Sequence, residues 1–431
     1  MTTGSFYPGH GTACLHAMAA DDCSLHFELG QLTPKQQADH QANIELTGML
    51  QLALVLLGQP QDHLALYEEF RQPPWQALLG RQLECFEALG VPLIARENFH
   101  FHPSANLYDS LASKRPHTPR LNLYMISGSN SVLHRDPDAL EVSRKLNSKF
   151  HFAQHAPAFG LPVPATMTCT REELRTPRVR DFFASHPGGV MLKIQGLAGA
   201  RNVTAVDSPQ AGIDYLEEFD DDLPVLLQER LSLESYTEMT ADLRIERERV
   251  SIANVRKILF AEGLWVGNRL GPDVALTMDQ QATLLEVGRY VQHHGYTADD
   301  PVNCGVDFFL SEAGDVLVTE INARWTGGLF PSEALGKLDL LDEPATVLFD
   351  IVPVEQRDAW MDFEQNYLLQ GNNAFRTLPL GFSPFVTPMN GTDMFFVWQL
   401  VTGDYDAFLR YKQHELQPGV LPTADLIDQA M

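Results

Sequence analysis

The pattern of apolar and polar residues in the first third of the chain predicts alternating helices and strands. Apolar residues dominate positions 42–57 and recur over 75–89, so we expect helices there. Short apolar runs at 91–95 and 121–126 predict strands. Helices that alternate with strands, with glycines between them, are typical of an α/β unit.

The middle of the chain carries a more regular pattern of short apolar strands and amphipathic helices. Thr277 and Gln280 form a capping-box pattern that opens a helix, and Gly295 marks its end. The turn 311–314 joins two strands into a hairpin. The predicted elements are strands at 190–194, 203–206, 225–227, 243–246, 250–258, 304–310 and 315–321, and helices around Lys149, at 208–219 and at 277–295.

The composition indicates a folded, acidic protein. The chain has 431 residues, 44% of them hydrophobic, and a formal net charge of −25. This charge repels phosphate backbones and anionic lipids, and no basic run offsets it, so we expect neither nucleic-acid nor membrane partners. The longest apolar run, 49–57, has about half the length of a membrane span. We find no signal-peptide pattern and no CxxC among the five cysteines, and therefore expect a cytoplasmic protein.

The strongest chemical signal lies in the hairpin formed by strands 304–310 and 315–321. Alternate side chains share one face of a strand, so Glu320 and Asn322 point the same way, and Asp307 on the partner strand can reach that face. Two carboxylates and an amide oxygen form an all-oxygen set that suits Mg²⁺. An ordinary hairpin with solvated polar positions is the alternative interpretation.

The segment Glu320-Ile321-Asn322-Ala323-Arg324 resembles the metal-binding E-x-N-x-R signature of the ATP-grasp superfamily, which includes biotin carboxylase and D-alanine–D-alanine ligase. In that family an acidic residue upstream completes the metal site, and Asp307 stands at the matching position. The resemblance implies that Asp307, Glu320 and Asn322 hold one or two Mg²⁺ ions, or Mn²⁺ in their place, at the phosphates of ATP. Arg324 would lie near the transferred phosphoryl group or the acyl oxygen.

Two lysines match further positions of the family pattern. Lys149 precedes a Gly-Leu-Pro, and Lys193 lies on a predicted strand before the glycine-rich segment 195–201. The resemblance implies that both ammonium groups neutralise phosphate charge, and that Gly196 and Gly199 belong to a lid over the phosphates. Solvated surface lysines are the alternative interpretation.

The segment 225–231 resembles the adenine-binding hinge of the family, an apolar strand that ends in E-K-x-L. With Leu231 on the family leucine, Glu234 falls on the position of a ribose-binding glutamate and Gln228 replaces the usual hinge glutamate. A shift by one residue makes Glu229 the hinge acid, and both alignments stay open. The ATP contacts implied in this segment are Gln228, Glu229, Arg230, Leu231 and Glu234.

A second hairpin, which begins at Asp242-Leu243-Arg244-Ile245, resembles a D-[ILV]-R-[VI] segment of the family. The partner strand of that segment commonly carries a basic residue that faces the γ-phosphate. Arg256 matches this position, and Lys257 faces the other way. Two charges on a solvated strand face are the alternative interpretation.

The resemblance implies an α/β protein with an N-terminal pre-ATP-grasp domain at 1–144, a two-lobed ATP-grasp domain at 145–335 and a C-terminal extension at 336–431. The implied reaction joins a small-molecule carboxylate to an amine through an acyl phosphate and releases ADP and phosphate. We expect an amino-acid or peptide ligase of specialised metabolism. An ATP-grasp carboxylase, a kinase-like phosphotransferase and an inactive nucleotide-binding regulator are the alternatives, and a homodimer is left open.

Overall fold

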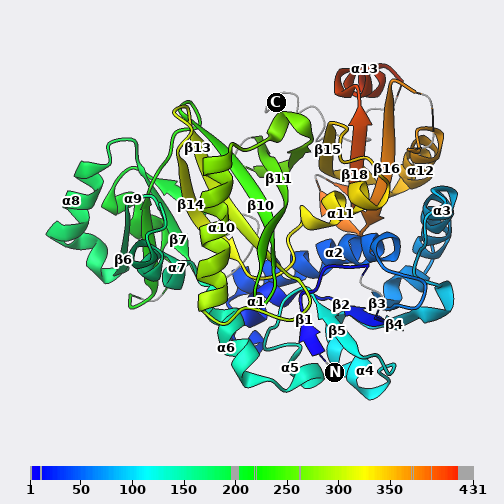
Figure 1. Cartoon of the computed structure of the whole chain (residues 1–431), viewed down its shortest axis with the longest axis horizontal. Coiled ribbons are helices and arrows are strands. Elements are labelled where there is room, and N and C mark those ends of the chain that lie inside the picture. Colours follow the sequence, from blue (N-terminus) through cyan, green and yellow to red (C-terminus); the bar gives the residue numbers. More distant parts are fainter. Residues whose placement is uncertain are drawn as a thin grey trace.

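The computed structural model describes residues 2–9, 12–195, 203–217, 219, 221–261, 264–369, 371, 373–389 and 391–415. The described chain forms three β-sheets with helices packed on them (Figure 1). In the figure, the N-terminal sheet lies at the bottom, a small sheet lies at the left, and a large sheet runs from the centre to the right. None of the described helices is long and apolar enough to cross a membrane.

The N-terminal sheet is parallel and has five strands. Its order is β1 (Thr2–Gly4), β5 (Arg120–Leu123), β2 (Cys14–Ala17), β3 (His63–Tyr67) and β4 (Phe99–His102). Strand order therefore reverses between β2 and β5, and ligands of parallel sheets commonly bind at the carboxyl ends of such strands. The helices of this unit are α1 (Asp21–His26), α2 (Pro34–Leu57), α3 (Trp75–Ala88), α4 (Leu107–Ser113) and α5 (Ser131–His134).

Both helices predicted in this unit are confirmed. Helix α2 begins earlier than expected, at Pro34, because Thr33 and Gln36 form a capping box there. The strand predicted at 91–95 is wrong: this segment crosses back over α2, where the Ile94 amide donates to the Val55 carbonyl at 3.1 Å. Its apolar residues pack against helices, which gives them the same pattern as a short buried strand.

The small sheet is antiparallel, in the order β6 (Thr166–Thr170), β9 (Pro224–Glu229), β7 (Val190–Ile194) and β8 (Val203–Val206). Helices α8 (Pro177–Ser185) and α9 (Pro209–Tyr215) pack on it around a separate apolar core. The three strands predicted here are confirmed. The helix predicted at 208–219 ends earlier, at Tyr215.

The large sheet is also antiparallel and contains nine strands. Helix α10 (Met278–His293) packs on one face of its first strands, and α11 (Leu329–Lys337), α12 (Arg357–Asn366) and α13 (Tyr405–Glu415) accompany the later ones. Along its main path the order is β14 (Val316–Asn322), β13 (Val302–Ser311), β10 (Tyr236–Ile245), β11 (Val250–Ala261), β12 (Leu264–Leu270), β15 (Ala345–Pro353), β18 (Thr392–Gly403) and β16 (Phe375–Phe382), and β17 (Thr387–Met389) pairs with β18.

The C-terminal third of the chain extends this large sheet and shares an apolar core with the N-terminal unit. Helix α2 lies directly on β16, where a Cβ at Gly381 would come within 2.2 Å of the Met49 carbonyl oxygen. Both predicted domain boundaries fall inside helices, since position 144 lies within α6 (Pro137–Leu146) and position 335 lies within α11, and the division into domains stays a prediction. A short helix, α7 (Lys149–His155), follows α6 and leads to the small sheet.

Candidate active site

The β10–β11 and β13–β14 hairpins carry a row of polar side chains on one face of the large sheet. Thr240 lies opposite both Arg256 and Asp307, and Asp307 lies opposite Glu320. Directly opposed residues of antiparallel strands share a face, so these side chains point to the same side. The other face is apolar and packs on α10, with Val306 and Ile321 buried among its residues.

A bulge in β14 brings Glu320 opposite Asp307. The register shifts after this pair, because Phe308 pairs with Val318 and leaves Thr319 as an extra residue. The Thr319 hydroxyl donates to the Asp307 carbonyl at 3.1 Å and stabilises the bulge. The bulge decides which residue of β14 faces Asp307. It cannot be predicted from the alternation of side chains along the strand.

The three residues predicted to bind metal lie together. Asn322 donates through Nδ2 to Asp307 Oδ2 at 3.0 Å, and its Oδ1 accepts from Arg324 Nη2 at 2.9 Å. Lys149 Nζ donates to Glu320 Oε2 at 2.6 Å, although the two residues are 171 positions apart. The structure therefore brings Asp307, Glu320, Asn322, Arg324 and Lys149 into one cluster.

The oxygen donors of this cluster suit a hard cation. Asp307 and Glu320 supply carboxylate oxygens, and the Asn322 amide oxygen has a second lone pair besides the one that faces Arg324. Among the described residues, no three His, Cys, Asp or Glu side chains form a metal site. Two carboxylates alone leave room for water or phosphate oxygens, which Mg²⁺ commonly retains.

The second predicted lysine lies on the small sheet. Lys193 is buried on β7, and its Nζ donates to Gln228 Oε1 on β9 at 2.7 Å. Gln228 in turn donates through Nε2 to the Thr166 hydroxyl at 3.2 Å. Gln228, predicted as a hinge residue, thus lies beside Lys193 on the sheet.

Electrostatic effects connect the two sheets. Burial opposes ionisation of Glu320, but Lys149 and Lys193 outweigh it and lower the pKa of this carboxyl. Burial and the neighbouring Glu320 raise the pKa of Asp307. Burial lowers the pKa of Lys193 to about 8, against the opposing effect of Glu320. Groups with such shifted pKa values commonly gather at functional sites.

Glu238 belongs to the same cluster, although it was not among the predicted site residues. It lies on β10 opposite Phe309, two residues before Thr240, and therefore on the polar face of the sheet. Burial and then Asp307 raise its pKa to about 7, whereas Lys193 opposes this effect. The alternation of β10 contained the signal, but only the part of this strand from 243 onward was predicted.

Arg256 is buried within the large sheet. Its guanidinium pairs with the carboxylate of Asp242, which is also fully buried, and contacts Asn254. Asp242 accepts further hydrogen bonds from Thr326 at 2.8 Å and Asn303 at 3.0 Å. The structure thus places Arg256 in a polar network beside the acidic row, and contact with a γ-phosphate stays a prediction.

Arg324 joins the acidic cluster to the N-terminal unit. Its Nη1 donates to the Tyr124 hydroxyl at 2.7 Å, and its Nε lies 3.8 Å from Asp22 Oδ1. Tyr124 follows β5 and Asp22 lies in α1, which follows β2. These are the two strands between which the order of the parallel sheet reverses, so Arg324 faces the crevice where ligands of such sheets commonly bind.

The remaining predicted ATP contacts lie apart from the cluster or outside the described residues. Glu229 is half-buried at the end of β9, and Leu231 is half-buried in the turn after it. Arg230 and Glu234 are exposed in that turn. Both hinge alignments therefore stay predictions. The predicted lid glycines Gly196 and Gly199 lie outside the described residues.

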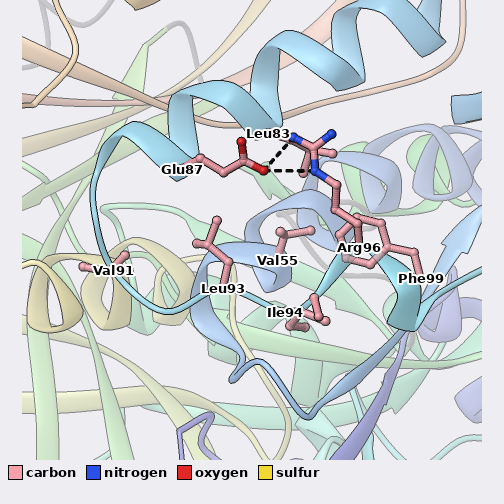
Figure 2. Close-up of a pocket in the computed structure, with 9 residues that line it drawn as sticks. Val55, Leu83, Glu87, Val91, Leu93, Ile94, Arg96 and Phe99 are labelled. Atoms are coloured by element: carbon pink, nitrogen blue, oxygen red, sulfur yellow. Dashed lines mark hydrogen bonds and ion pairs between the residues drawn. The ribbon is translucent and has the colours of Figure 1, made fainter.

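A cavity of about 310 Å³ lies away from this cluster, against helix α3 (Figure 2). Its lining is mostly apolar, and Arg96 pairs with Glu87 at its rim through hydrogen bonds of 3.0 and 2.6 Å. Both side chains are about half exposed, so their ion pair adds little to any binding site. None of the predicted site residues lines this cavity.

Comparison with solved structures identifies the fold. Carboxyaminoimidazole synthase from Aspergillus clavatus, in complex with ADP and 5-aminoimidazole ribonucleotide, matches with a TM-score of 0.55, 11% identity, and 97% of this chain and 99% of the other covered. Phosphoribosylamine–glycine ligase from Thermotoga maritima matches with a TM-score of 0.55 and 15% identity, over 94% of this chain and 96% of the other.

The biotin carboxylase domain of a Hydrogenobacter thermophilus carboxylase, in complex with MgADP, ADP and bicarbonate, matches with a TM-score of 0.50 and 10% identity, over 94% and 90% of the two chains. No model of a known protein family and no curated protein matches the sequence. The three enzymes belong to the ATP-grasp superfamily. The chain therefore has the ATP-grasp fold with an N-terminal α/β unit, as the sequence predicted. At these identities the likeness establishes the fold alone.

Proposed function

We propose that the protein is an ATP-dependent ligase that joins a carboxylate to an amine through an acyl phosphate and releases ADP and phosphate. The observation that carries the proposal is the convergence of acids from the large sheet with lysines from α7 and the small sheet. Lys149 contacts Glu320 directly, and Lys193 is close enough to alter its pKa. Buried charges are costly, so a cluster of this kind is more readily explained by a charged substrate than by stability.

The chain supplies each group that such a reaction requires. Asp307, Glu320 and Asn322 would hold Mg²⁺, which when bound reduces the repulsion between phosphate oxygens. Lys149 and Lys193 would take up phosphate charge, and Gln228 holds Lys193 in place through their hydrogen bond. No nucleophile of the protein is needed, since the carboxylate attacks the phosphate and the amine attacks the acyl phosphate.

The position of Arg324 supports an acceptor bound against the N-terminal unit. Arg324 contacts Asn322 on one side and Tyr124 on the other. A guanidinium there would stabilise negative charge that develops on the acyl oxygen as the amine attacks. An amino acid or peptide as the substrate is the narrower form of this proposal.

A carboxylase is the second candidate, with bicarbonate as the carboxylate. It is favoured by the comparisons, because the Hydrogenobacter domain was solved with bicarbonate and the Aspergillus enzyme is a carboxyaminoimidazole synthase. Its reaction would use the same acidic cluster and the same two lysines. The two candidates differ only in the acid that receives the phosphoryl group.

One experiment separates these candidates. The protein is incubated with ATP and Mg²⁺, and with pooled carboxylic acids, pooled amines, both pools, or bicarbonate. A ligase releases ADP and phosphate only with both pools, gives a product lighter by one water, and forms a hydroxamate when hydroxylamine replaces the amine. Release that requires bicarbonate identifies the carboxylase.

Other outcomes contradict the proposal. AMP and pyrophosphate would exclude an acyl phosphate, and a phosphorylated product without free phosphate would indicate a kinase. Tight ATP binding without hydrolysis in any pool would indicate a nucleotide-binding regulator.

A further inference from the structure

Gln195, the residue directly after β7, joins three segments that are distant in sequence. Its Oε1 accepts from the Ser148 hydroxyl at 3.1 Å. Its Nε2 lies 2.7 Å from His26 Nε2 and 3.5 Å from the Asn147 carbonyl oxygen. One side-chain amide thus contacts the end of α1 and both residues of the turn between α6 and α7.

The partners determine the orientation of the amide. The Asn147 carbonyl can only accept, so the nitrogen of the Gln195 amide lies on that side. His26 Nε2 must then accept a hydrogen bond, and the ring is neutral with its proton on Nδ1. Burial is the main cause that lowers the pKa of His26 to about 4; contact with the Asn147 backbone opposes it, and the positive charges of Arg144 and Lys149 add to it.

Gln195 and its partner Ser148 each lie close in sequence to one of the two lysines of the candidate site. Gln195 is two residues from Lys193, and Ser148 immediately precedes Lys149. Ser148 also caps α7, because its hydroxyl oxygen accepts from the His151 amide at 3.2 Å. The hydrogen bonds of Gln195 therefore set the distance between the two lysine-bearing segments, and they fix both segments against α1.

We infer that Gln195 is a positioning residue, and that its bond to His26 aligns Lys193 and Lys149 for nucleotide phosphates. The inference rests on the proposed function, since it assumes that both lysines bind phosphate. Helix α1 also carries Asp22, which faces Arg324. The same bond thus ties the two lysines to the helix that borders the proposed acceptor crevice.

Gln195→Glu tests the contact itself. The substitution places a carboxylate oxygen beside His26 Nε2, and this favours the protonated ring. We expect His26 not to titrate between about pH 5.5 and 8.5 in the wild-type protein, whereas its pKa rises by about 2 units or more in the variant. Histidine NMR signals measured against pH show the shift, and His26→Asn assigns the signal.

The affinity for Mg-ADP, measured by calorimetry, tests the positioning role. Gln195→Ala should weaken it by roughly fivefold to tenfold, the effect of about one hydrogen bond. In Gln195→Glu the affinity should be near that of the wild-type protein below the new pKa of His26 and fall above it. The control is Gln76→Glu, the same charge change at an exposed position of α3. It should change neither the pKa of His26 nor the affinity for Mg-ADP.

Two results would overturn the inference, and a third concerns the proposed function. An unshifted His26 in Gln195→Glu means that the two side chains are not in contact. A shifted His26 with Mg-ADP affinity that does not follow its titration means that the contact is only structural. If the wild-type protein does not bind Mg-ADP at all, the proposed function fails, and the inference fails with it whatever His26 does.

Discussion

The two sheets that meet at the candidate site hold their charged residues in opposite ways. On the large sheet, the side chains of Asp307, Asn322 and Arg324 are linked to one another by hydrogen bonds. On the small sheet, Lys193 is buried in an apolar strand, and its hydrogen bond in the described part of the chain goes to Gln228. The acids are therefore fixed by their neighbours, whereas Lys193 is fixed by burial and a single contact.

Because of this difference, substitutions in the two sheets should have different effects on the stability of the fold. A charge within a linked network cannot be removed without leaving its partners unpaired, which costs free energy of folding. A buried lysine with one neutral partner carries a desolvation cost that its removal relieves. Substitutions of the linked charged residues in the large sheet should therefore lower both the stability of the fold and the activity. Substitution of Lys193 should lower the activity but raise the stability. Four measurements examine this comparison.

The largest effect is expected from Asp242→Ala in the large sheet. The change leaves the fully buried guanidinium of Arg256 without its carboxylate, which should lower the free energy of unfolding by about 3–5 kcal/mol. Denaturant titration measures the loss. The control is Asp221→Ala beside the small sheet. The Asp221 carboxylate pairs with Arg171 but is mostly exposed to solvent, so its removal should cost less than about 1 kcal/mol. Equal losses would contradict the difference between the sheets.

Glu320→Ala should remove most of the ATP turnover. It removes a proposed metal ligand and the partner of Lys149, and a lost charge-stabilising group commonly lowers kcat on the order of 100-fold. The steady-state rate of ADP formation measures the effect. Glu312→Ala, in the exposed turn of the same hairpin, is the control and should leave the rate unchanged. Undiminished turnover in Glu320→Ala would remove the metal-site assignment.

Lys193→Met should stabilise the protein while it weakens nucleotide binding. Lys193 has its pKa lowered from 10.5 to about 8, so below pH 8 the folded state bears the full cost of the buried charge. Between pH 8 and 10.5 the unfolded state binds more protons, and the free energy of unfolding of the wild-type protein should rise with pH. At pH 7 the variant should be more stable by about 2 kcal/mol. A less stable variant would show that the Gln228 contact outweighs desolvation.

A pH-dependent effect is expected from a buried acid at the far end of the large sheet. Glu364 on α12 is fully buried beside Gln399, and burial raises its pKa from 4.5 to about 8. The folded state therefore binds more protons between pH 4.5 and 8, and stability should fall as pH rises through this window. Relative to the wild-type protein, Glu364→Gln should gain up to about 4 kcal/mol in the free energy of unfolding between pH 4.5 and pH 8. If the difference in free energy of unfolding between the variant and the wild-type protein did not change with pH, the raised pKa of Glu364 would be contradicted.

The antiparallel strands of the site could be predicted because their local signals agree with their environment. Strands at 190–194, 203–206 and 304–310 combine an apolar run with a turn at a boundary, and the structure contains all three. The alternation of β14 placed Glu320 and Asn322 on one face, as the pairing of the strands confirms. These features depend on residues within a few positions of one another.

Most parallel strands of the N-terminal unit could not be predicted in the same way. Only β5 was predicted, at 121–126, and the structure confirms it at Arg120–Leu123. Strands β2 and β3 were missed, and 91–95 was mistaken for a strand. Buried parallel strands are short apolar runs without alternation, and a loop packed on a helix can show the same run. Only the pairing of β2 and β3 with distant strands distinguishes the two.

The sequence by itself determined which residue types stand on each strand, and so the acids and lysines of the site. The tertiary structure decided their partners: Lys149 with Glu320, Arg256 with Asp242, and Gln195 with His26. Each pair joins side chains from different strands or helices, at distances set by sheet register and helix packing. Local patterns carry no information about those distances, because they depend on how the whole chain closes around the site.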